Sequence, residues 1–186
     1  MKAAVYSGTF APMHIGHLSI LDFIVREKLF DKVYLVVSPR NPFKDSSLTE
    51  SAEERLAAAR EAIGRHPELK NVVVSDMEFH MPPPSYTIRT LDLMKEKEPD
   101  NDFTLIIGAD NLASMLKWKE GARILTEYGV AVYPRKGFDS EELRDNLLEV
   151  NPDFRIMLLD APLADVSSTE IRKGMAEGRD MSALLM

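Results

Sequence analysis

The sequence predicts an α/β protein with a doubly wound, mostly parallel sheet and helices on both faces of that sheet. Short, continuously apolar runs alternate along the chain with longer segments of helical period. Continuous apolar runs are typical of strands covered on both faces, and strand–helix alternation is typical of parallel sheets with right-handed crossovers. Since no internal repeat or Gly/Ser-rich linker interrupts this pattern, residues 1–186 are expected to form a single domain.

The individual elements follow from the local pattern. β-branched apolar runs predict strands at Ala3–Tyr6, Lys32–Ser38, Val72–Ser75, Phe103–Ile107, Val130–Tyr133 and Phe154–Leu159. Helical spacing predicts helices at Leu18–Leu29, Ala52–Ile63, Tyr86–Lys97, Leu112–Tyr128, Glu141–Val150 and Thr169–Glu177. Ligands of open α/β sheets lie beyond the carboxyl ends of the strands, so a site is expected in the loops that follow the strands.

Composition excludes several classes of function. The chain has 23 Lys and Arg against 30 Asp and Glu, a net charge of −7, which disfavours nucleic acid and anionic membrane as partners. It has no cysteine, so disulfides, thiolate metal sites and a cysteine nucleophile are excluded. No apolar run approaches the ~20 residues that span a bilayer, and the N-terminus does not resemble a signal peptide. We expect a cytoplasmic protein, and the sequence leaves a homo-oligomer open.

The loop after the first predicted strand, Ser7–His17, carries the first chemical motif. Gly8 permits a sharp exit from the strand, and His14 and His17 are spaced to share one face of a helix start, with Gly16 between them. Two imidazole donors beside the amides of a helix N-terminus favour a phosphate site. The alternatives are a helix start with two incidental histidines, or a metal site, for which the sequence offers no third ligand nearby.

A second motif, Val166–Arg172, lies near the other end of the chain. Ser167 and Glu170 fit a helix capping box, which by itself explains both residues. The functional interpretation adds that the hydroxyls and amides of this helix start face an anion, with Arg172 supplying charge to a polyphosphate. The two interpretations are compatible, because a capped helix start is also an anion site.

Together the two motifs resemble the nucleotidyltransferase superfamily with the HxGH signature. The resemblance rests on Gly8-Thr9-Phe10, Pro12 and His14-x-Gly16-His17, together with Ser167-Ser168-Thr169-x-Ile171-Arg172. Within that superfamily the chain is most similar to the bacterial nicotinate-nucleotide adenylyltransferases. Four further stretches carry that likeness: Pro39–Lys44, Pro84–Thr87, Ile107–Asn111 with the downstream Trp118, and Tyr133–Gly137.

The resemblance implies adenylyl transfer from ATP to nicotinate mononucleotide, with Mg²⁺ bound mainly through ATP phosphate oxygens and no metal site of the protein's own. It implies catalytic roles at the phosphates for His14, His17, Lys44 and Arg172. Nucleotide contacts are implied for Gly8, Thr9, Phe10, Gly16, Gly108, Asp110, Ser167, Ser168 and Thr169. Substrate contacts are implied for Lys44, Thr87, Trp118 and Arg135, with Trp118 stacking on the pyridine ring and Thr87 near the nicotinate carboxylate.

Structural explanations stand beside these roles. Trp118 could be a core or rim aromatic, Lys44 a solvated loop charge, and Asp110 the N-cap of the helix at Leu112–Tyr128. Arg135 could form a solvated pair with its neighbour Lys136.

Two other functions also stay open. One is transfer to another phosphorylated small molecule such as phosphopantetheine, and the other is a non-catalytic nucleotide-binding module. The second draws on Ala11, where the family usually carries Asp or Asn, and on the absence of the family's usual C-terminal tail.

Overall fold

The computed structural model describes residues 1–39 and 50–186, and its centre is a six-stranded sheet in the order β3-β2-β1-β4-β5-β6. Every neighbouring pair of strands is parallel. The strands are β1 (Lys2–Gly8), β2 (Lys32–Val37), β3 (Val72–Ser75), β4 (Asp102–Gly108), β5 (Val130–Tyr133) and β6 (Ile156–Leu158). The predicted fold class is confirmed, and each predicted strand lies within two residues of an observed one.

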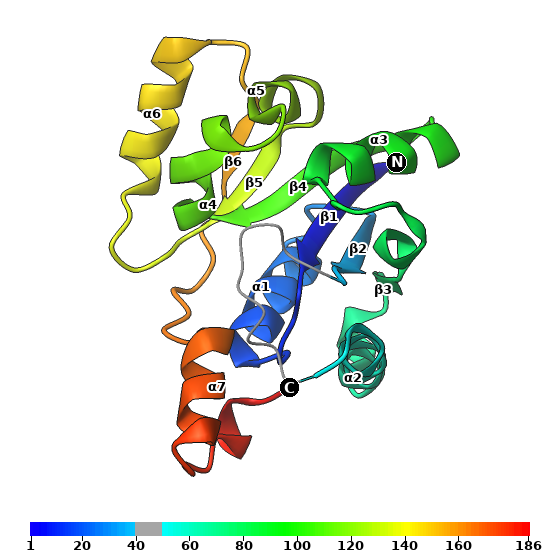
Figure 1. The fold of residues 1–186 in the computed structure, drawn as a ribbon. Helices are drawn as coiled ribbons and strands as arrows, with labels where there is room; N and C mark the ends of the chain where they lie inside the picture. Colours follow the sequence, from blue (N-terminus) through cyan, green and yellow to red (C-terminus); the bar gives the residue numbers. More distant parts are fainter. Residues whose placement is uncertain (40–49) are drawn as a thin grey trace.

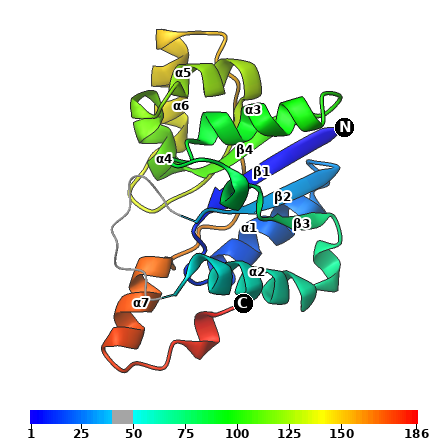
Figure 2. The same ribbon diagram turned by 45° about the vertical axis from the view of Figure 1, so that its right-hand side comes forward.

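Helices cover both faces of this sheet (Figures 1 and 2). They are α1 (Ile15–Arg26), α2 (Ala52–Gly64), α3 (Thr87–Lys97), α4 (Ala109–Ser114), α5 (Gly121–Arg123), α6 (Ser140–Val150) and α7 (Ser168–Ala176). Alternate residues of β1 enter two separate cores. Ala3 and Val5 pack with α3 and α4, whereas Ala4 and Tyr6 pack with α1 and α2. The sheet is therefore doubly wound, and it reverses its strand order between the neighbours β1 and β4.

One predicted helix is wrong. The segment Leu112–Tyr128 is divided into α4, a short 3₁₀ turn, α5 and a π-helical turn at Ile124–Tyr128. The chain turns back at Trp118, whose backbone is extended, and at Glu120, whose φ of 52° is left-handed. Gly121 then approaches the carbonyl oxygen of Met115 so closely that any Cβ would overlap it. This close backbone approach is a tertiary feature that helical spacing does not reveal.

The first helix also differs from its prediction, because it begins at Ile15 rather than Leu18. Within the part of the chain that the structure describes, no helix has the length and apolar character needed to cross a bilayer.

Candidate active site

A cavity of about 390 Å³ opens at the carboxyl ends of the central strands, where the strand order reverses. Its walls come from β1, β4 and β5, from Ser38 just after β2, and from the segments around Glu78, the start of α3 and the α4–α5 connection. Four of the predicted site residues line it, namely Gly8, Thr9, Thr87 and Trp118. Residues that lie far apart in the sequence therefore meet at the edge of the sheet where the topology places a ligand.

The two histidines of the first motif form the N-cap of α1. The Nδ1 atom of His14 accepts a hydrogen bond from the amide of Gly16 at 3.1 Å. The Nδ1 atom of His17 accepts one from the amide of His14, also at 3.1 Å. The arrangement is a reciprocal capping box built from imidazoles instead of hydroxyl and carboxylate groups. It explains why the helix starts three residues earlier than its apolar stripe predicts.

This cap also determines where the ring protons lie. Because each Nδ1 atom accepts a hydrogen bond, the proton of each neutral ring is on Nε2, at the opposite edge. The rings stack with centroids 3.7 Å apart. Burial, together with the charge of Arg135, lowers the pKa of His14 from 6.5 to about 4, against an opposing effect of Glu170. At neutral pH His14 is therefore an uncharged Nε2–H donor.

Gly16 is required by the position of the His14 ring. A Cβ at Gly16 would lie 2.8 Å from His14 Cε1 and 2.9 Å from its Nδ1, which is closer than real Cβ contacts. Edge-to-face aromatic contacts support the ring of His17, since its centroid lies 5.0 Å from that of Phe10 and 6.1 Å from that of Tyr6. The motif is thus held by packing as well as by the cap.

Helix α7 brings the second motif against the first. Ser167 caps α7 and forms the predicted capping box with Glu170. Arg172 Nη1 donates to the carbonyl oxygen of Ala11 at 2.6 Å, and Ser168 Oγ donates to that of Pro12 at 3.0 Å. The loop around Ala11 is therefore anchored through its backbone, so a polar side chain at this position is not needed to fix it. Thr169 accepts a hydrogen bond from Arg172 at 3.3 Å.

The loop after β4 places a carboxylate beside Arg135. Gly108, and not Asp110, is the N-cap residue of α4, so the capping explanation of Asp110 is wrong. Asp110 Oδ1 is buried and accepts no hydrogen bond within residues 1–39 and 50–186, and Arg135 Nε lies 3.7 Å from it. A Cβ at Gly108 would lie 3.0 Å from both Arg135 and Tyr133. An unsatisfied buried acceptor of this kind suits the hydroxyl of a ligand.

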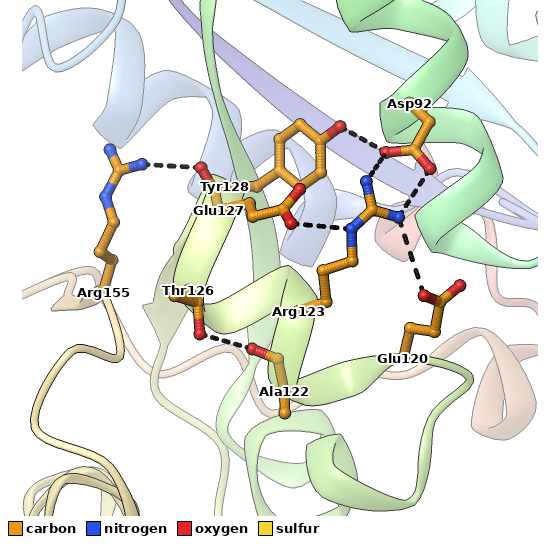
Figure 3. Close-up of polar contacts among 8 residues, drawn as sticks. All are labelled: Asp92, Glu120, Ala122, Arg123, Thr126, Glu127, Tyr128 and Arg155. Atoms are coloured by element: carbon orange, nitrogen blue, oxygen red, sulfur yellow. Dashed lines mark hydrogen bonds and ion pairs between the residues drawn. The ribbon is translucent and has the colours of Figure 1, made fainter.

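Trp118 and Thr87 line the same cavity from two segments that an ion pair joins. Beyond Trp118 in the sequence, the guanidinium of Arg123 donates to both carboxylate oxygens of Asp92 on α3, at 2.9 and 2.8 Å (Figure 3). Tyr128 donates to the same carboxylate at 2.6 Å. These hydrogen bonds lower the pKa of Asp92 although partial burial alone would raise it. Because Thr87 begins α3, the ion pair connects the two sides of the cavity.

One predicted site residue, Lys44, lies outside the described residues. Several residues that line the cavity are not predicted from the sequence, among them Ser38, Glu78, Asn111, Lys117 and Lys119. Ser38 ends a predicted strand and Asn111 lies in the loop region after another, so position alone could have indicated them. Glu78 gives no such signal, since it belongs to no periodic pattern.

The described part of the chain gathers no group of three or more His, Asp or Glu side chains that could hold a metal ion. The two motifs instead bring together imidazole, guanidinium and hydroxyl groups.

Comparisons with known proteins identify the family of the chain. Residues 5–174 match the family model described as cytidylyltransferase-like. A protein of Bacteroides fragilis named "probable nicotinate-nucleotide adenylyltransferase" is 39% identical, over 99% of this chain and 87% of its own. A Flavobacterium johnsoniae protein of the same name is 37% identical, over 100% and 92%.

Solved structures show the same fold. The nicotinic acid mononucleotide adenylyltransferase of Plasmodium falciparum, complexed with NaAD, superimposes with a TM-score of 0.79 at 23% identity, covering 97% of this chain and 87% of its own. Its complex with APC has the same TM-score at 22% identity and the same coverage. With near-full-length relatives well above 30% identity, the chain belongs to the nicotinate-nucleotide adenylyltransferases, a nucleotidyltransferase family.

Proposed function

We propose that this protein transfers the adenylyl group of ATP to nicotinate mononucleotide, giving nicotinate adenine dinucleotide and pyrophosphate. The observation that carries the proposal is the junction of one cavity with two phosphate-type motifs. Thr87 and Trp118 line the cavity together with Gly8 and Thr9, and the loop that contains Gly8 and Thr9 continues to His14 and is bound by Arg172 of α7. Residues 1–186 would act as one catalytic domain, with the reaction at the reversal of strand order.

The reaction needs no covalent intermediate with the protein. A phosphate oxygen of nicotinate mononucleotide attacks the α-phosphorus of ATP, the bond from that phosphorus to the bridging oxygen breaks, and pyrophosphate leaves with the bonding electrons. The protein positions the reactants and stabilises developing charge. The Nε2–H groups of His14 and His17 are suited to donate to phosphate oxygens, because the cap directs both Nδ1 atoms to backbone amides.

The remaining phosphate contacts would come from the helix start of α7. Ser167, Ser168 and Thr169 lie in its first turn, and Arg172 reaches back to the same loop as the histidines. Lys44 would screen the approach of two anionic substrates. Mg²⁺ would enter as the Mg²⁺–ATP substrate, coordinated by phosphate oxygens and water, which suits a site whose described residues gather no cluster of three metal ligands.

Recognition of the two nucleotides would use the cavity. The indole of Trp118 can stack on the pyridine ring, while Thr87 and the amides at the start of α3 can donate to the nicotinate carboxylate. Asp110 Oδ1 has the free acceptor capacity that a ribose hydroxyl needs, with Arg135 beside it.

The test is pyrophosphate release with Mg²⁺–ATP and three acceptors in parallel, namely nicotinate mononucleotide, nicotinamide mononucleotide and phosphopantetheine. We expect release with the first to exceed the others at least tenfold. Faster release with another acceptor would keep the chemistry but reassign the pocket around Trp118. No release with any acceptor, despite measurable ATP binding, would contradict the proposal and favour a non-catalytic nucleotide-binding module.

A further inference from the structure

A buried arginine that belongs to neither motif lies behind the Ser7–His17 loop. Arg55 on α2 is 1% exposed, although it is a charged side chain. Its Nη1 donates to the carbonyl oxygens of Thr9 at 2.6 Å and Ser38 at 2.8 Å, and its Nη2 donates to that of Pro39 at 2.9 Å. The loops after β1 and β2 are thus joined by one guanidinium. Burying such a group is unfavourable unless its hydrogen bonds compensate.

The bond to Thr9 determines the orientation of one peptide. The Thr9–Phe10 peptide is trans, so its C=O and N–H point in opposite directions. Because the carbonyl points to Arg55, the amide of Phe10 points away from α2. Within residues 1–39 and 50–186, the amides of Thr9 and Phe10 donate to no acceptor. Phe10 has a left-handed φ of 46°, which is unfavourable for a residue with a side chain and needs support from its surroundings.

Two arginines therefore hold the loop on either side of Phe10. Arg55 binds the carbonyl that precedes it, and Arg172 of α7 binds the carbonyl of Ala11, which follows it. The amide of Phe10 lies between these two anchors and points away from Arg55, so it can donate to an anion, as amides do in an anion-binding nest.

A buried carboxylate supports the same structure from the other side. Glu78, 2% exposed, accepts hydrogen bonds from Ser38 and Thr90. Ser38 in turn donates its amide to the carbonyl oxygen of Gly8 at 2.8 Å. Arg55 therefore fixes the carbonyl of Ser38 while Glu78 fixes its hydroxyl, and Ser38 holds the end of β1. The two buried side chains therefore meet at Ser38.

We propose that Arg55 and Glu78 are positioning residues for the nucleotidyl transfer. They orient the Thr9–Phe10 peptide and the end of β1 so that these groups can meet the phosphates. The inference rests on the proposed function, since it supposes that ATP phosphates lie against this loop. Arg55 acts through the backbone carbonyls that it binds, and Glu78, which also lines the cavity, acts through the hydroxyl of Ser38.

The main test compares Arg55→Met with Arg60→Met. Arg60 is on the same helix, half-exposed and ion-paired with Asp76 at 3.2 Å, so it is a matched control. Pyrophosphate release is measured while ATP and nicotinate mononucleotide are varied separately, and ATP affinity is measured by calorimetry. We expect Arg55→Met to lower kcat roughly 10- to 100-fold, the usual effect of misplacing a reacting group. The KM for nicotinate mononucleotide should change less than about threefold.

Two more variants keep the inference testable if Arg55→Met does not fold. Arg55→Lys retains a donor and should recover part of kcat. Glu78→Gln retains the shape of the side chain but donates where the carboxylate accepts, so it should lower kcat with little change in the KM for nicotinate mononucleotide. Combining the two should cost less than the product of the single effects, because both act through Ser38.

A folded Arg55→Met protein with unchanged kcat would overturn the inference. The inference would also be overturned if Arg55→Met lost activity equally with respect to both substrates and Arg60→Met showed the same losses, because shared losses indicate general destabilisation. If the wild-type protein binds ATP but releases no pyrophosphate, the proposed function fails instead. The ATP affinities of the same variants would then still decide the inference. A loss of ATP affinity confined to the Arg55 and Glu78 variants would support it, and unchanged ATP affinity would overturn it.

Discussion

Replacing His14 by Asn and by Ala separates its observed role in the helix cap from its proposed role at the phosphates, because the two roles would use opposite edges of one ring. Asn is a good N-cap and can accept from the Gly16 amide, whereas Ala cannot. Loss of the cap should lower the free energy of unfolding by about 1 kcal/mol. For a chain of 186 residues, that corresponds to about 2–4 °C in Tm. Only His14→Ala should show this loss.

Activity should respond differently. Neither Asn nor Ala places an Nε2–H donor at the phosphates, so both should lower kcat by roughly 10²–10³, the usual worth of one preorganised donor. The assays are thermal unfolding by circular dichroism and steady-state pyrophosphate release. His17→Gln is the companion variant, since Gln suits the third position of a capping box. If His14→Asn kept wild-type kcat while His14→Ala lost both activity and stability, His14 would be a cap alone and the catalytic role would be refuted.

Three further results are expected. The pKa of His14 is 6.5 in the unfolded chain but about 4 in the folded protein, so the unfolded chain binds more protons between these pH values. The contribution of His14 to the free energy of unfolding should therefore fall by up to about 3 kcal/mol as pH decreases from 6.5 to 4. Denaturant titrations of wild type and His14→Asn should diverge over that range, and parallel curves would contradict the shift. Trp118→Ala should raise the KM for nicotinate mononucleotide roughly tenfold or more, and an effect on ATP alone would refute stacking. Asp92→Asn, which weakens the pair with Arg123, should raise the same KM roughly threefold, whereas unchanged kinetics would show that the pair does not position the cavity.

The strands and the two terminal motifs could be predicted because their signals are local. Continuous apolar runs require burial on both faces, and the spacing of His14 and His17 is a property of one helical turn. The break at Trp118 could not be predicted, since it depends on Gly121 meeting the carbonyl of Met115 across a turn. An apolar period continues through such a break without a visible change.

Arg55 shows the same limit from another side. Its spacing with Leu56 and Ala59 places it on the inner stripe of a helix, but a charged side chain there can end in water by extending past the core. Only the positions of the Thr9, Ser38 and Pro39 carbonyls, which come from loops far away in the sequence, explain why the guanidinium stays inside. Glu78 was missed for a related reason, because its partners belong to three other segments.

The imidazole cap of α1 also restricts which amino acids can stand at its two positions. The helix start needs an acceptor, whereas a phosphate needs a donor several ångströms away on the other edge of a rigid side chain. Serine and aspartate are too short to serve both partners, and lysine has no acceptor. Asparagine and glutamine have their acceptor oxygen and donor nitrogen on one flexible amide group. These two atoms cannot point in opposite directions as the two nitrogens of a rigid ring do. Of the twenty side chains, neutral imidazole alone meets both demands, so random substitution at His14 and His17 should yield folded proteins far more often than active ones.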